Sequence, residues 1–553
     1  MENFNIKVKS NKYLISLIVF ACIYTGILIY CQNIIGISYW DIFVYLNNAM
    51  LFSHINIGSQ LSVPPIISLL TSIPFQLGFI SQTSLFCVSG ILFVFLMIGI
   101  YVLFNYRFDN KCSFIAGILF SMTSLVVTWA VSGSNDLPSL SFAVWALIFT
   151  IKAVNEDFKY YYLAFGLFLL SFFTRFTGGF ILIVMISYMI LNIDKVKSQL
   201  TKGNIVKFIL FFSVAGIIIG IIYYSYLGGI PFIAQFVEVS NSNQVSNVNV
   251  GYELNNFYYL EHLPKFISSY SVNDLYFSSL STVYNTPTPL SYAILCLSAL
   301  GIVVFISNIF NKHNREDKLF KYKSLALIAI GIFIIFSYSH VSYLITELLF
   351  IGLVLLLYKW LPNKINKIDL LMILWMGIFI ILHSYHPVKV DRYIVTIIIP
   401  IIYFMIIAIN SIARHIRYEK SPTIILGIIL LLLIAFNANY MQSITHENPH
   451  TTEEKSASSW LKNYDKNLSN CNISSDRGVV FSWYLKKYTY TTIPRVLKST
   501  NESLDEKLHS INAKYYIDSS SNLTEINGYH RIYKNNNPDY KLSIYEKNNY
   551  TTN

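Results

Sequence analysis

The sequence has little charge for its length. Only 12% of its 553 residues are Asp, Glu, Lys or Arg, whereas a soluble globular chain carries about 25%. Hydrophobic residues make up 54% of the chain. With so few charges over so long a chain, most of the surface must face lipid, which excludes an ordinary soluble protein.

Cysteine and basic–aromatic clusters are also scarce. The chain has six cysteines and no CxxC motif, and only Cys471 lies away from the apolar runs, so there is no disulfide framework. The formal net charge is +11, yet no segment alternates basic and aromatic residues as a nucleic-acid surface would. The first apolar run, 13–34, lacks a small-residue cleavage site, so we expect an uncleaved first span.

Long apolar runs dominate the first four fifths of the chain. A helix needs about 20 apolar residues to cross the hydrocarbon core. The runs predict thirteen spans, at 13–34, 84–105, 112–131, 137–154, 160–174, 176–192, 205–227, 286–310, 322–338, 342–358, 369–384, 393–411 and 422–440. A further run, 63–80, begins with Pro64-Pro65 and contains Pro74, so we expect a short helix at the outer membrane surface.

The placement of Lys and Arg orients these spans. With the N-terminus inside, the predicted inner segments before residue 442 hold 22 Lys and Arg residues and the outer ones hold 4. Cytoplasmic loops carry such an excess of positive charge. Counting 63–80 as a full span would reverse every later loop and destroy the bias.

The fold class expected is therefore a polytopic α-helical membrane protein with a small α/β domain outside. Residues 1–441 form the membrane domain, with long outer loops at 35–83 and 228–285, and residues 442–553 form the outer domain. Within this tail, Thr451 to Glu454 has the pattern of a capping box that starts a helix, and 513–518 and 540–545 have the composition of strands.

Few ionisable residues fall at the outer ends of spans, and charge near lipid is expensive. Asp41 follows Tyr39-Trp40 just after the first span, where it is either a functional acid or a solvated loop carboxylate. Asp136 is the only charge in the very short second outer loop. It is either functional or a helix N-cap.

Arg175 lies at the outer turn of a tight helical hairpin, without an acidic neighbour in sequence. It either extends to the membrane surface from an apolar stem or binds a phosphate, which suits its planar set of donors. Arg392, followed by Tyr393, also lies at the outer end of its span, where Asp391 is able to pair with it or with Lys389.

Glu347 lies about two turns inside its span. An acid at that depth is either functional or bonded to a buried Tyr or Ser. His386, with His340 and His383, falls on the outer side, but no HxxxH or HxH spacing indicates a metal site. We therefore expect interfacial histidines, and we assign no metal ligands.

The order of several short motifs resembles the GT-C glycosyltransferase superfamily. The similar branch holds the protein O-mannosyltransferases and the bacterial aminoarabinose transferase of lipid A. The motifs, all on the predicted outer side, lie at 39–45 (YWDIFVY), 63–70 (VPPIISLL), 135–139 (NDLPS), 172–178 (FFTRFTG) and 391–400 (DRYIVTIIIP). The tail has no WWDxG motif, so it does not resemble the oligosaccharyltransferase branch.

The resemblance implies an inverting transfer of one sugar from a polyprenyl-phosphate donor to a hydroxyl of a glycan, protein or lipid on the outer face. By position, it assigns Asp41 and Asp136 as catalytic acids and Arg175 as the contact to the lipid phosphate. Arg392-Tyr393 matches the family's late Arg-Tyr pair, and we assign these two residues to binding of the lipid phosphate as well. Glu347, Lys389 and His386 are additional candidates.

The chain departs from the family pattern at two positions, Ile42, where many members have Glu, and Val63, where many have a charged residue or His. The first departure leaves a single base, which an inverting displacement needs. The partners expected are the lipid-linked donor, the acceptor and membrane lipid, and not nucleic acid. We expect that no cofactor is required, and a divalent metal remains an open alternative.

The main rival function is a transporter or flippase of lipid-linked glycans. Transporters tend to have repeated halves and polar breaks near the membrane midplane. In this chain the polar groups lie at the outer ends of spans, which favours the transferase. A surface protein anchored without catalysis does not explain so many spans.

The predicted topology places the two ends of the chain on opposite sides of the membrane. In intact cells, an impermeant thiol reagent should label a cysteine introduced near Asn553 and not one introduced near Glu2. The reagent should label both after permeabilisation. Equal labelling of the two sites in intact cells would contradict the assignment.

Overall fold

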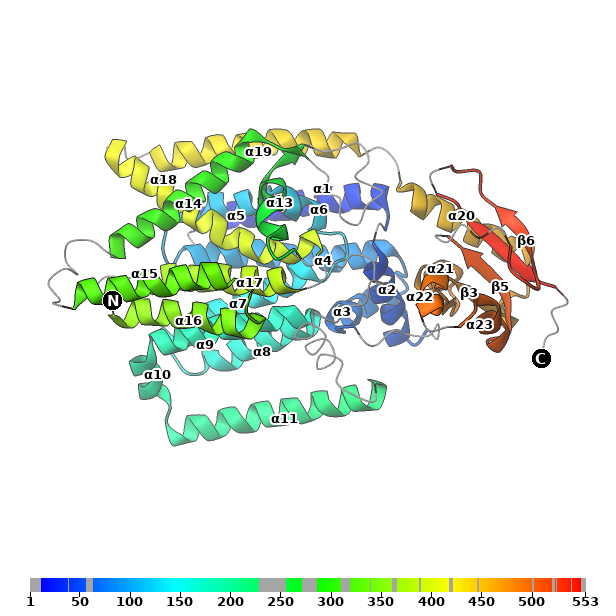
Figure 1. Ribbon diagram of the computed structural model, residues 1–553, viewed down its shortest axis with the longest axis horizontal. Coiled ribbons are helices and arrows are strands. Elements are labelled where there is room, and N and C mark those ends of the chain that lie inside the picture. Colours follow the sequence, from blue (N-terminus) through cyan, green and yellow to red (C-terminus); the bar gives the residue numbers. More distant parts are fainter. Residues whose placement is uncertain are drawn as a thin grey trace.

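The computed structural model of the chain describes residues 11–37, 39–55, 63–227, 255–270, 286–309, 319–338, 340–360, 366–386, 389–416, 421–444, 447–499, 502–519, 523, 525–538 and 540–548. Long helices run roughly along the longest dimension of the molecule, and a small domain with a β-sheet lies at one end (Figure 1). This end of the helical bundle is called the sheet-domain end below.

Ten helical segments among the described residues are long and apolar enough to cross a membrane, or eleven if one bent pair is counted. The protein is therefore a multi-pass membrane protein, as expected. The ten are α1 (Lys12–Ile35), α4 (Gln82–Phe104), α7 (Asp136–Asn155), α11 (Lys202–Leu227), α14 (Pro289–Ile309), α15 (Phe320–Ser337), α16 (Tyr343–Trp360), α17 (Lys367–Tyr385), η6 with α18 (Asp391–Ile397 and Ile398–Ile416), and α19 (Ser421–Ser443).

Ten of the thirteen predicted spans coincide with these helices, and the other three are shorter or broken in the structure. The run 112–131 forms two short helices, α5 (Asn110–Ser121) and α6 (Ser124–Trp129). The run 160–174 forms α8 (Tyr160–Thr174), whose 15 residues extend only about 22 Å. The third run forms η2 (Phe176–Phe180) and α9 (Ile181–Leu191), which bend by 90° into α10 (Ile193–Gln199). Hydropathy alone does not detect these breaks.

Helix ends that the placement of Lys and Arg assigns to the same side of the membrane are close together in the structure. Arg107, after α4, lies with its Nε 2.9 Å from Asp369 Oδ1 at the start of α17. Lys367 Nζ donates a hydrogen bond of 2.8 Å to Asn192 Oδ1, after α9. At the opposite end of the bundle, the Ile35 carbonyl accepts a hydrogen bond from the tail. Which end faces the cytoplasm stays a prediction.

The described part of the first predicted outer loop contains two helices. The expected short helix is α3 (Ile66–Gln76), and α2 (Trp40–Phe52) was not expected. Both lie between the long helices and the sheet domain (Figure 1). Of the second loop, the structure describes α13 (Tyr258–Ile267) and strand β1 (Ser269–Tyr270), which pairs antiparallel with β2 (Thr286–Pro287). The rest of that loop lies outside the described residues.

The tail forms the α/β domain that the sequence predicts. Its five-stranded sheet has the order β4-β3-β5-β7-β6; β3 pairs parallel with β4 and β5, and β7 pairs antiparallel with β5 and β6. The elements are α20 (Pro449–Tyr464), η7 (Leu468–Asn470), β3 (Asn472–Ser475), α21 (Gly478–Leu485), β4 (Tyr490–Thr491), α22 (Pro494–Ser499), α23 (Leu504–Ser510), β5 (Ala513–Asp518), β6 (Tyr529–Lys534) and β7 (Ser543–Lys547).

Two details of the predicted tail differ. The helix begins at Pro449, where Asn448 accepts the capping hydrogen bond, so no capping box forms at Thr451. Instead, Thr451 Oγ1 donates to the carbonyl of Ile37, 2.7 Å away, and ties the tail to the end of α1. The strand predicted at 540–545 begins three residues later, at Ser543, whereas β5 occupies the predicted 513–518.

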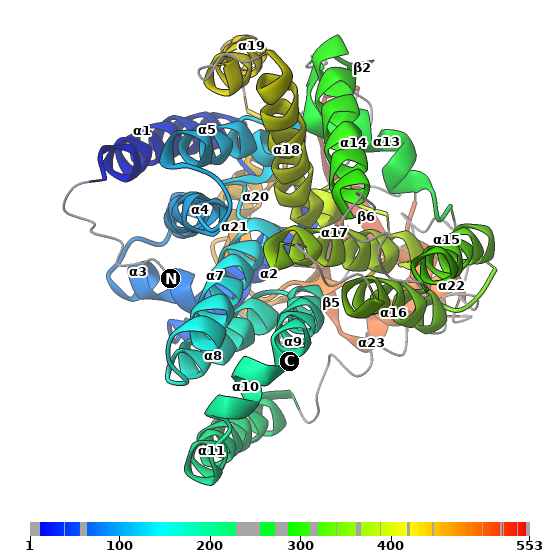
Figure 2. The same cartoon turned by 90° about the vertical axis from the view of Figure 1, so that its left-hand side faces the viewer.

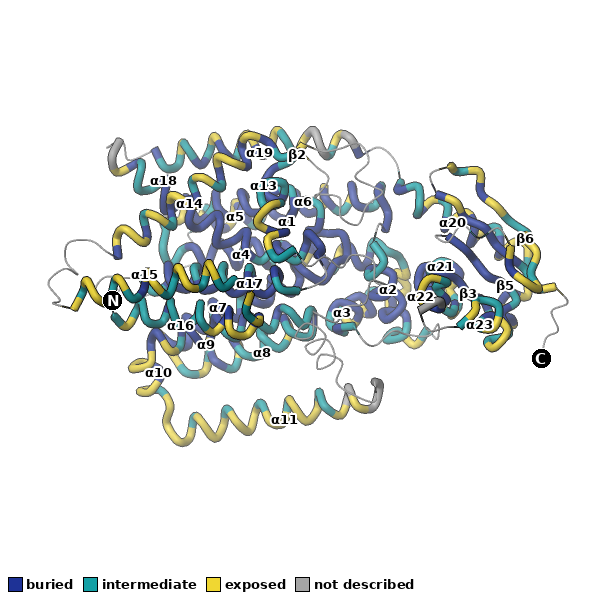
Figure 3. Tube along the Cα trace, viewed as in Figure 1, coloured by how far each residue is buried: buried dark blue, intermediate teal, exposed yellow. Residues whose placement is uncertain are grey.

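Helix α2 is buried between the bundle and α21 of the tail (Figure 3). Asn47 Nδ2 donates a hydrogen bond of 2.8 Å to the Val479 carbonyl, and the rings of Phe43 and Tyr484 meet edge to face at 5.5 Å. Because α2 packs on both sides, the bundle and the sheet domain share one contact region.

The core of the bundle surrounds α17, which lies near the centre when the helices are viewed from their other end (Figure 2). Its Trp375 is fully buried. Helix α11 lies at the edge of the bundle, and its described side chains are mostly exposed, as expected for a helix in contact with lipid (Figures 2 and 3). At Gly301, α14 approaches α18 so closely that an added Cβ would lie 1.8 Å from the Phe404 carbonyl oxygen.

We predict that Gly301→Ala lowers the thermal unfolding midpoint in detergent, because the new methyl group meets backbone rather than a flexible side chain. Overpacking of this kind typically costs about 1–3 kcal/mol. Gly427→Ala, in α19 with no atom within 4 Å of its Cβ position, is the matched control and should raise the midpoint slightly or not at all. Equal behaviour of the two variants would contradict the close helix crossing.

Candidate active site

Four charged side chains from distant parts of the sequence meet at the sheet-domain end of the bundle. Asp41 lies in the first turn of α2, Asp136 begins α7, Arg175 follows α8, and Arg392 lies in η6. All four were identified from the sequence as candidate site residues. The structure brings them into one chain of ion pairs.

Asp136 is at the centre of this chain. Its Oδ1 lies 2.8 Å from Arg175 Nη1, and its Oδ2 lies 3.1 Å from Arg392 Nε. Arg392 Nη2 in turn donates a hydrogen bond of 2.7 Å to Asp41 Oδ2. The order is therefore Arg175, Asp136, Arg392, Asp41, and the charges alternate in sign. In a region of low dielectric constant, buried charges need oppositely charged partners.

The interpretation of Asp136 as a helix N-cap is wrong. The residue before α7 is Asn135, and Asp136 is the first residue of the helix. The carboxylate sits at the positive end of the helix dipole and contacts both guanidinium groups. Similarly, Asp391 accepts a hydrogen bond from the backbone N–H of Arg392, while the guanidinium turns toward the other two acids.

Solvent access differs along the chain of charges. The side chains of Arg392 and Asp136 are 2% and 3% exposed, whereas Arg175 is 14% and Asp41 36% exposed. The two central members are therefore fixed parts of the structure. The terminal members, one carboxylate and one guanidinium, are those that a substrate is able to reach.

Arg175 is held in place and retains free donors. Its Nε donates to Thr177 Oγ1 at 2.8 Å and its Nη1 donates to Asn135 Oδ1 at 3.0 Å. Its guanidinium carbon lies 4.1 Å from the centre of the Tyr393 ring. Among the described residues, Nη2 makes no hydrogen bond, so its two N–H groups remain for a ligand. An arginine that merely extends to the membrane surface would not have these partners.

Aromatic rings support both arginines. The Arg392 guanidinium carbon lies 3.8 Å from the centre of the Tyr39 ring and 5.3 Å from that of Trp129. Such contacts fix the plane of a guanidinium and favour its charge. Tyr393 packs against Arg175, and its contact with the lipid phosphate stays a prediction. The sequence reasoning missed Tyr39 and Trp129 as supports, although their aromatic character near an outer helix end was a signal.

The turn that carries Arg175 is pressed against α7. A Cβ at Gly178 would lie 2.2 Å from Ser139 Oγ and 2.7 Å from Ser171 Oγ, so only glycine fits there. Ser139 and Ser171 donate to each other's carbonyl oxygens at 2.9 Å and thereby join α7 to α8. These small residues bring Arg175 within reach of Asp136.

The three additional candidates lie elsewhere or play another part. Lys389 Nζ donates to the carbonyls of His383, Ser384 and His386 at 3.2, 2.6 and 2.7 Å, and so satisfies the end of α17. The His386 ring meets Tyr393 edge to face at 5.8 Å. Glu347 is buried in α16 and has no hydrogen bond or ion pair to the four charges.

No group of three or more His, Cys, Asp and Glu side chains has the arrangement of a metal site in the described part of the chain. Asp41 and Asp136 already face guanidinium groups. A cation between them would have to displace Arg392, which is fully buried. The four charges therefore fit an anionic ligand at Arg175 better than a metal ion.

Comparisons with known proteins give the family model and the folds to which the chain is similar. Residues 62–219 match the family model described as dolichyl-phosphate-mannose-protein mannosyltransferase. Among curated proteins, none matches the sequence significantly.

The fold is similar to two solved structures. The crystal structure of ArnT from Cupriavidus metallidurans, bound to undecaprenyl phosphate, has a TM-score of 0.58 and 8% identity over 97% of this chain and 98% of its own. The apo oligosaccharyltransferase of Archaeoglobus fulgidus has a TM-score of 0.51 and 12% identity over 93% of this chain and 70% of its own. The protein therefore shares its fold with these two structures, and residues 62–219 match the mannosyltransferase family model, in agreement with the resemblance inferred from the motifs.

Proposed function

We propose that this protein is an inverting glycosyltransferase that moves a monosaccharide from a polyprenyl-phosphate donor to an acceptor hydroxyl at the sheet-domain end of the bundle. The observation that carries the proposal is the alternating chain of four charges. One end is an accessible carboxylate, Asp41, and the other is an accessible guanidinium, Arg175. The name of the matched family and the undecaprenyl phosphate bound by ArnT support a lipid phosphate as the donor's anchor.

Asp41 is the proposed general base. Its Oδ2 is fixed by Arg392 Nη2, and its Oδ1 accepts no hydrogen bond from the described residues. In the proposed reaction Asp41 takes the proton of the acceptor hydroxyl, the hydroxyl oxygen bonds to the anomeric carbon, and the bond from that carbon to the phosphate oxygen breaks. Polyprenyl phosphate leaves with the electron pair. A single displacement inverts the anomeric centre and needs no second carboxylate as nucleophile.

Arg175 is the proposed phosphate contact. The leaving phosphate gains negative charge as the bond breaks, and a fixed cation in a site of low dielectric constant stabilises that charge. Asp136 and Arg392 do not need to touch the substrate. They hold the base and the cation at opposite ends of the same network. The base can then act on the acceptor hydroxyl while the cation stabilises the leaving phosphate.

A flippase is less consistent with the structure. Transporter sites lie near the membrane midplane, between halves that move against each other. The charges here lie at the helix ends beside a packed domain, and the two central charges are buried and paired. A catalytic test distinguishes the functions, because a flippase moves its lipid without breaking a glycosidic bond.

We predict that Asp41→Asn reduces sugar transfer about 10²–10⁴-fold, the usual size of base catalysis. Donor binding and thermal stability should stay close to those of the wild type. The matched control is Asp157→Asn, an exposed acid paired only with Lys159, and it should keep full activity. Transfer of a labelled sugar to membrane acceptors measures the rates. Retention of more than about a tenth of the activity by Asp41→Asn would demote Asp41 to a structural carboxylate.

For Arg175 we predict weaker donor binding. Arg175→Ala should reduce the affinity for a polyprenyl-phosphate sugar by about 1.5–3 kcal/mol, the scale of a hydrogen bond to a charged group. Arg175→Lys should retain part of the affinity, because it keeps the charge and loses the planar set of donors. Arg107→Lys, in the ion pair with Asp369 at the other end of the bundle, is the control. Titration of the donor in detergent measures all four proteins, and unchanged affinity in Arg175→Ala would remove Arg175 from the site.

A further inference from the structure

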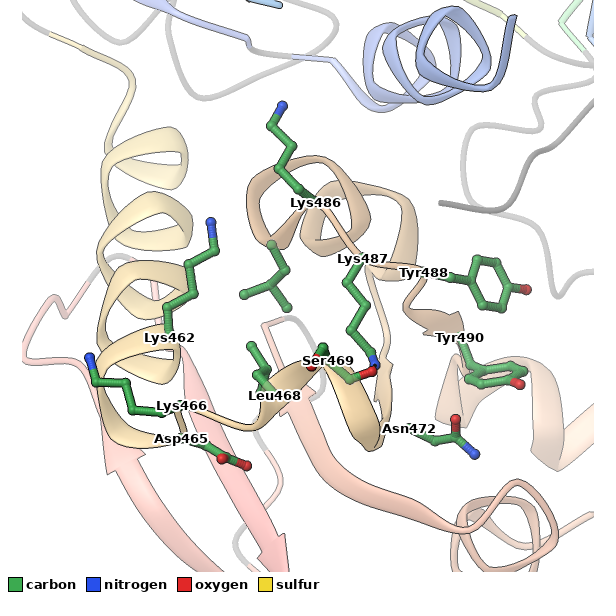
Figure 4. Close-up of a pocket in the computed structure, with 11 residues that line it drawn as sticks. Lys462, Asp465, Lys466, Leu468, Ser469, Asn472, Lys486, Lys487, Tyr488 and Tyr490 are labelled. Atoms are coloured by element: carbon green, nitrogen blue, oxygen red, sulfur yellow. Dashed lines mark hydrogen bonds between the residues drawn. The ribbon is translucent and has the colours of Figure 1, made fainter. Parts of the chain in front are cut away.

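The sheet domain contains a cavity of about 640 Å³ that the proposed reaction does not use. It lies between the end of α20, η7 and the connection from α21 to β4 (Figure 4). Four lysines line it, namely Lys462, Lys466, Lys486 and Lys487. We call it the basic cavity.

None of these lysines has an ion-pair partner among the described residues. Lys462 Nζ donates to the Tyr484 carbonyl at 2.8 Å, and Lys487 Nζ donates to the Ser469 carbonyl at 2.5 Å. The cavity has one acid, Asp465, which already accepts hydrogen bonds of 2.8 and 2.9 Å from Lys514 and Tyr515, both outside the lining. The basic cavity therefore has a positive charge that the protein itself does not neutralise.

Lys486 shows this imbalance most clearly. It ends α21 in the left-handed backbone conformation, with φ of 56°. Its ammonium lies 3.1 Å from the centre of the Trp483 ring and 3.9 Å from Met50 Sδ. Desolvation in this setting, together with repulsion from Lys462, lowers the pKa of Lys486 to about 7. A bound anion would relieve both effects.

The basic cavity is coupled to the candidate active site through α2. Asp41 lies in the first turn of this helix, and Met50, which Lys486 contacts, lies nine residues later. Nine residues correspond to about 14 Å along a helix axis. The hydrogen bond from Asn47 to Val479 fixes α2 against α21 between these points. An acceptor bound at both points would have to span this distance.

Given the proposed transferase function, we propose that the basic cavity binds an anionic group, phosphate or carboxylate, of the acceptor. Ammonium groups on flexible stems bind phosphate as point charges. The rings of Tyr488 and Tyr490, which meet edge to face at 4.9 Å, add an aromatic wall of the kind that packs against apolar faces of a ligand. The acceptor is thus held at its anion while its hydroxyl lies at Asp41.

The test uses the full-length protein in detergent and inorganic pyrophosphate as the probe. The double variant Lys486→Gln/Lys487→Gln should weaken pyrophosphate binding at least tenfold in calorimetric titration, with donor affinity unchanged. The control is Lys507→Gln/Lys541→Gln, which removes the same charge from the same domain outside the cavity and should change binding less than twofold. In transfer assays, pyrophosphate should compete with the acceptor and not with the donor.

Four outcomes would overturn the inference. The first is a wild-type protein that does not bind pyrophosphate at millimolar concentration, and the second is equal weakening in both double variants. The third is competition with the donor, which would place the anion at Arg175. Since anionic lipid is another source of phosphate, retention by vesicles containing it, without competition against the acceptor, would also count against an acceptor site. The Asp41 and Arg175 variants test the proposed function separately, so the two ideas are able to fail independently.

Discussion

The structure depends on the need to neutralise charge in a region shielded from water. Arg392 and Asp136 are almost completely buried, and an unpaired charge at such a depth is strongly destabilising. Each therefore fixes the position of its partners. Through this requirement η6, α7, the turn after α8 and the start of α2 are brought to one point, although up to 351 residues of sequence separate them. The candidate site is formed by the pairing that stabilises the fold.

The long helices and the tail's sheet could be predicted because their signals are local. Apolar runs identify the helices, and the composition of 513–518 identifies β5. The breaks could not be predicted, because a run such as 112–131 has the same hydropathy whether it is one helix or two. Helix α2 was missed for a different reason: its Asn47 looks like a loop residue until its partner, the Val479 carbonyl in the tail, is known.

For the site, the four charged residues could be identified from the sequence, but their arrangement could not. Few charges occur at helix ends on one side of the membrane, so Asp41, Asp136, Arg175 and Arg392 were conspicuous. Their pairing depends on close packing that sequence spacing does not reveal, such as the contact of Gly178 with Ser139. Lys389 was an additional candidate, but its ammonium group donates hydrogen bonds to backbone carbonyls. The sequence does not distinguish a charged side chain that hydrogen-bonds to backbone carbonyls from one that binds a ligand.

Because α2 is buried on two faces, the bundle and the sheet domain are not independent modules. One face of α2 belongs to the bundle and the other to the sheet domain, and Arg477 of that domain lies 5.9 Å from the ring of Trp40, the neighbour of Asp41. The orientation of Asp41 therefore depends on a domain that contributes none of the four charges. If two related proteins exchanged only their tails, the contacts on one face of the helix that carries this carboxylate would change. Tail and bundle are expected to diversify together, as a single unit of inheritance.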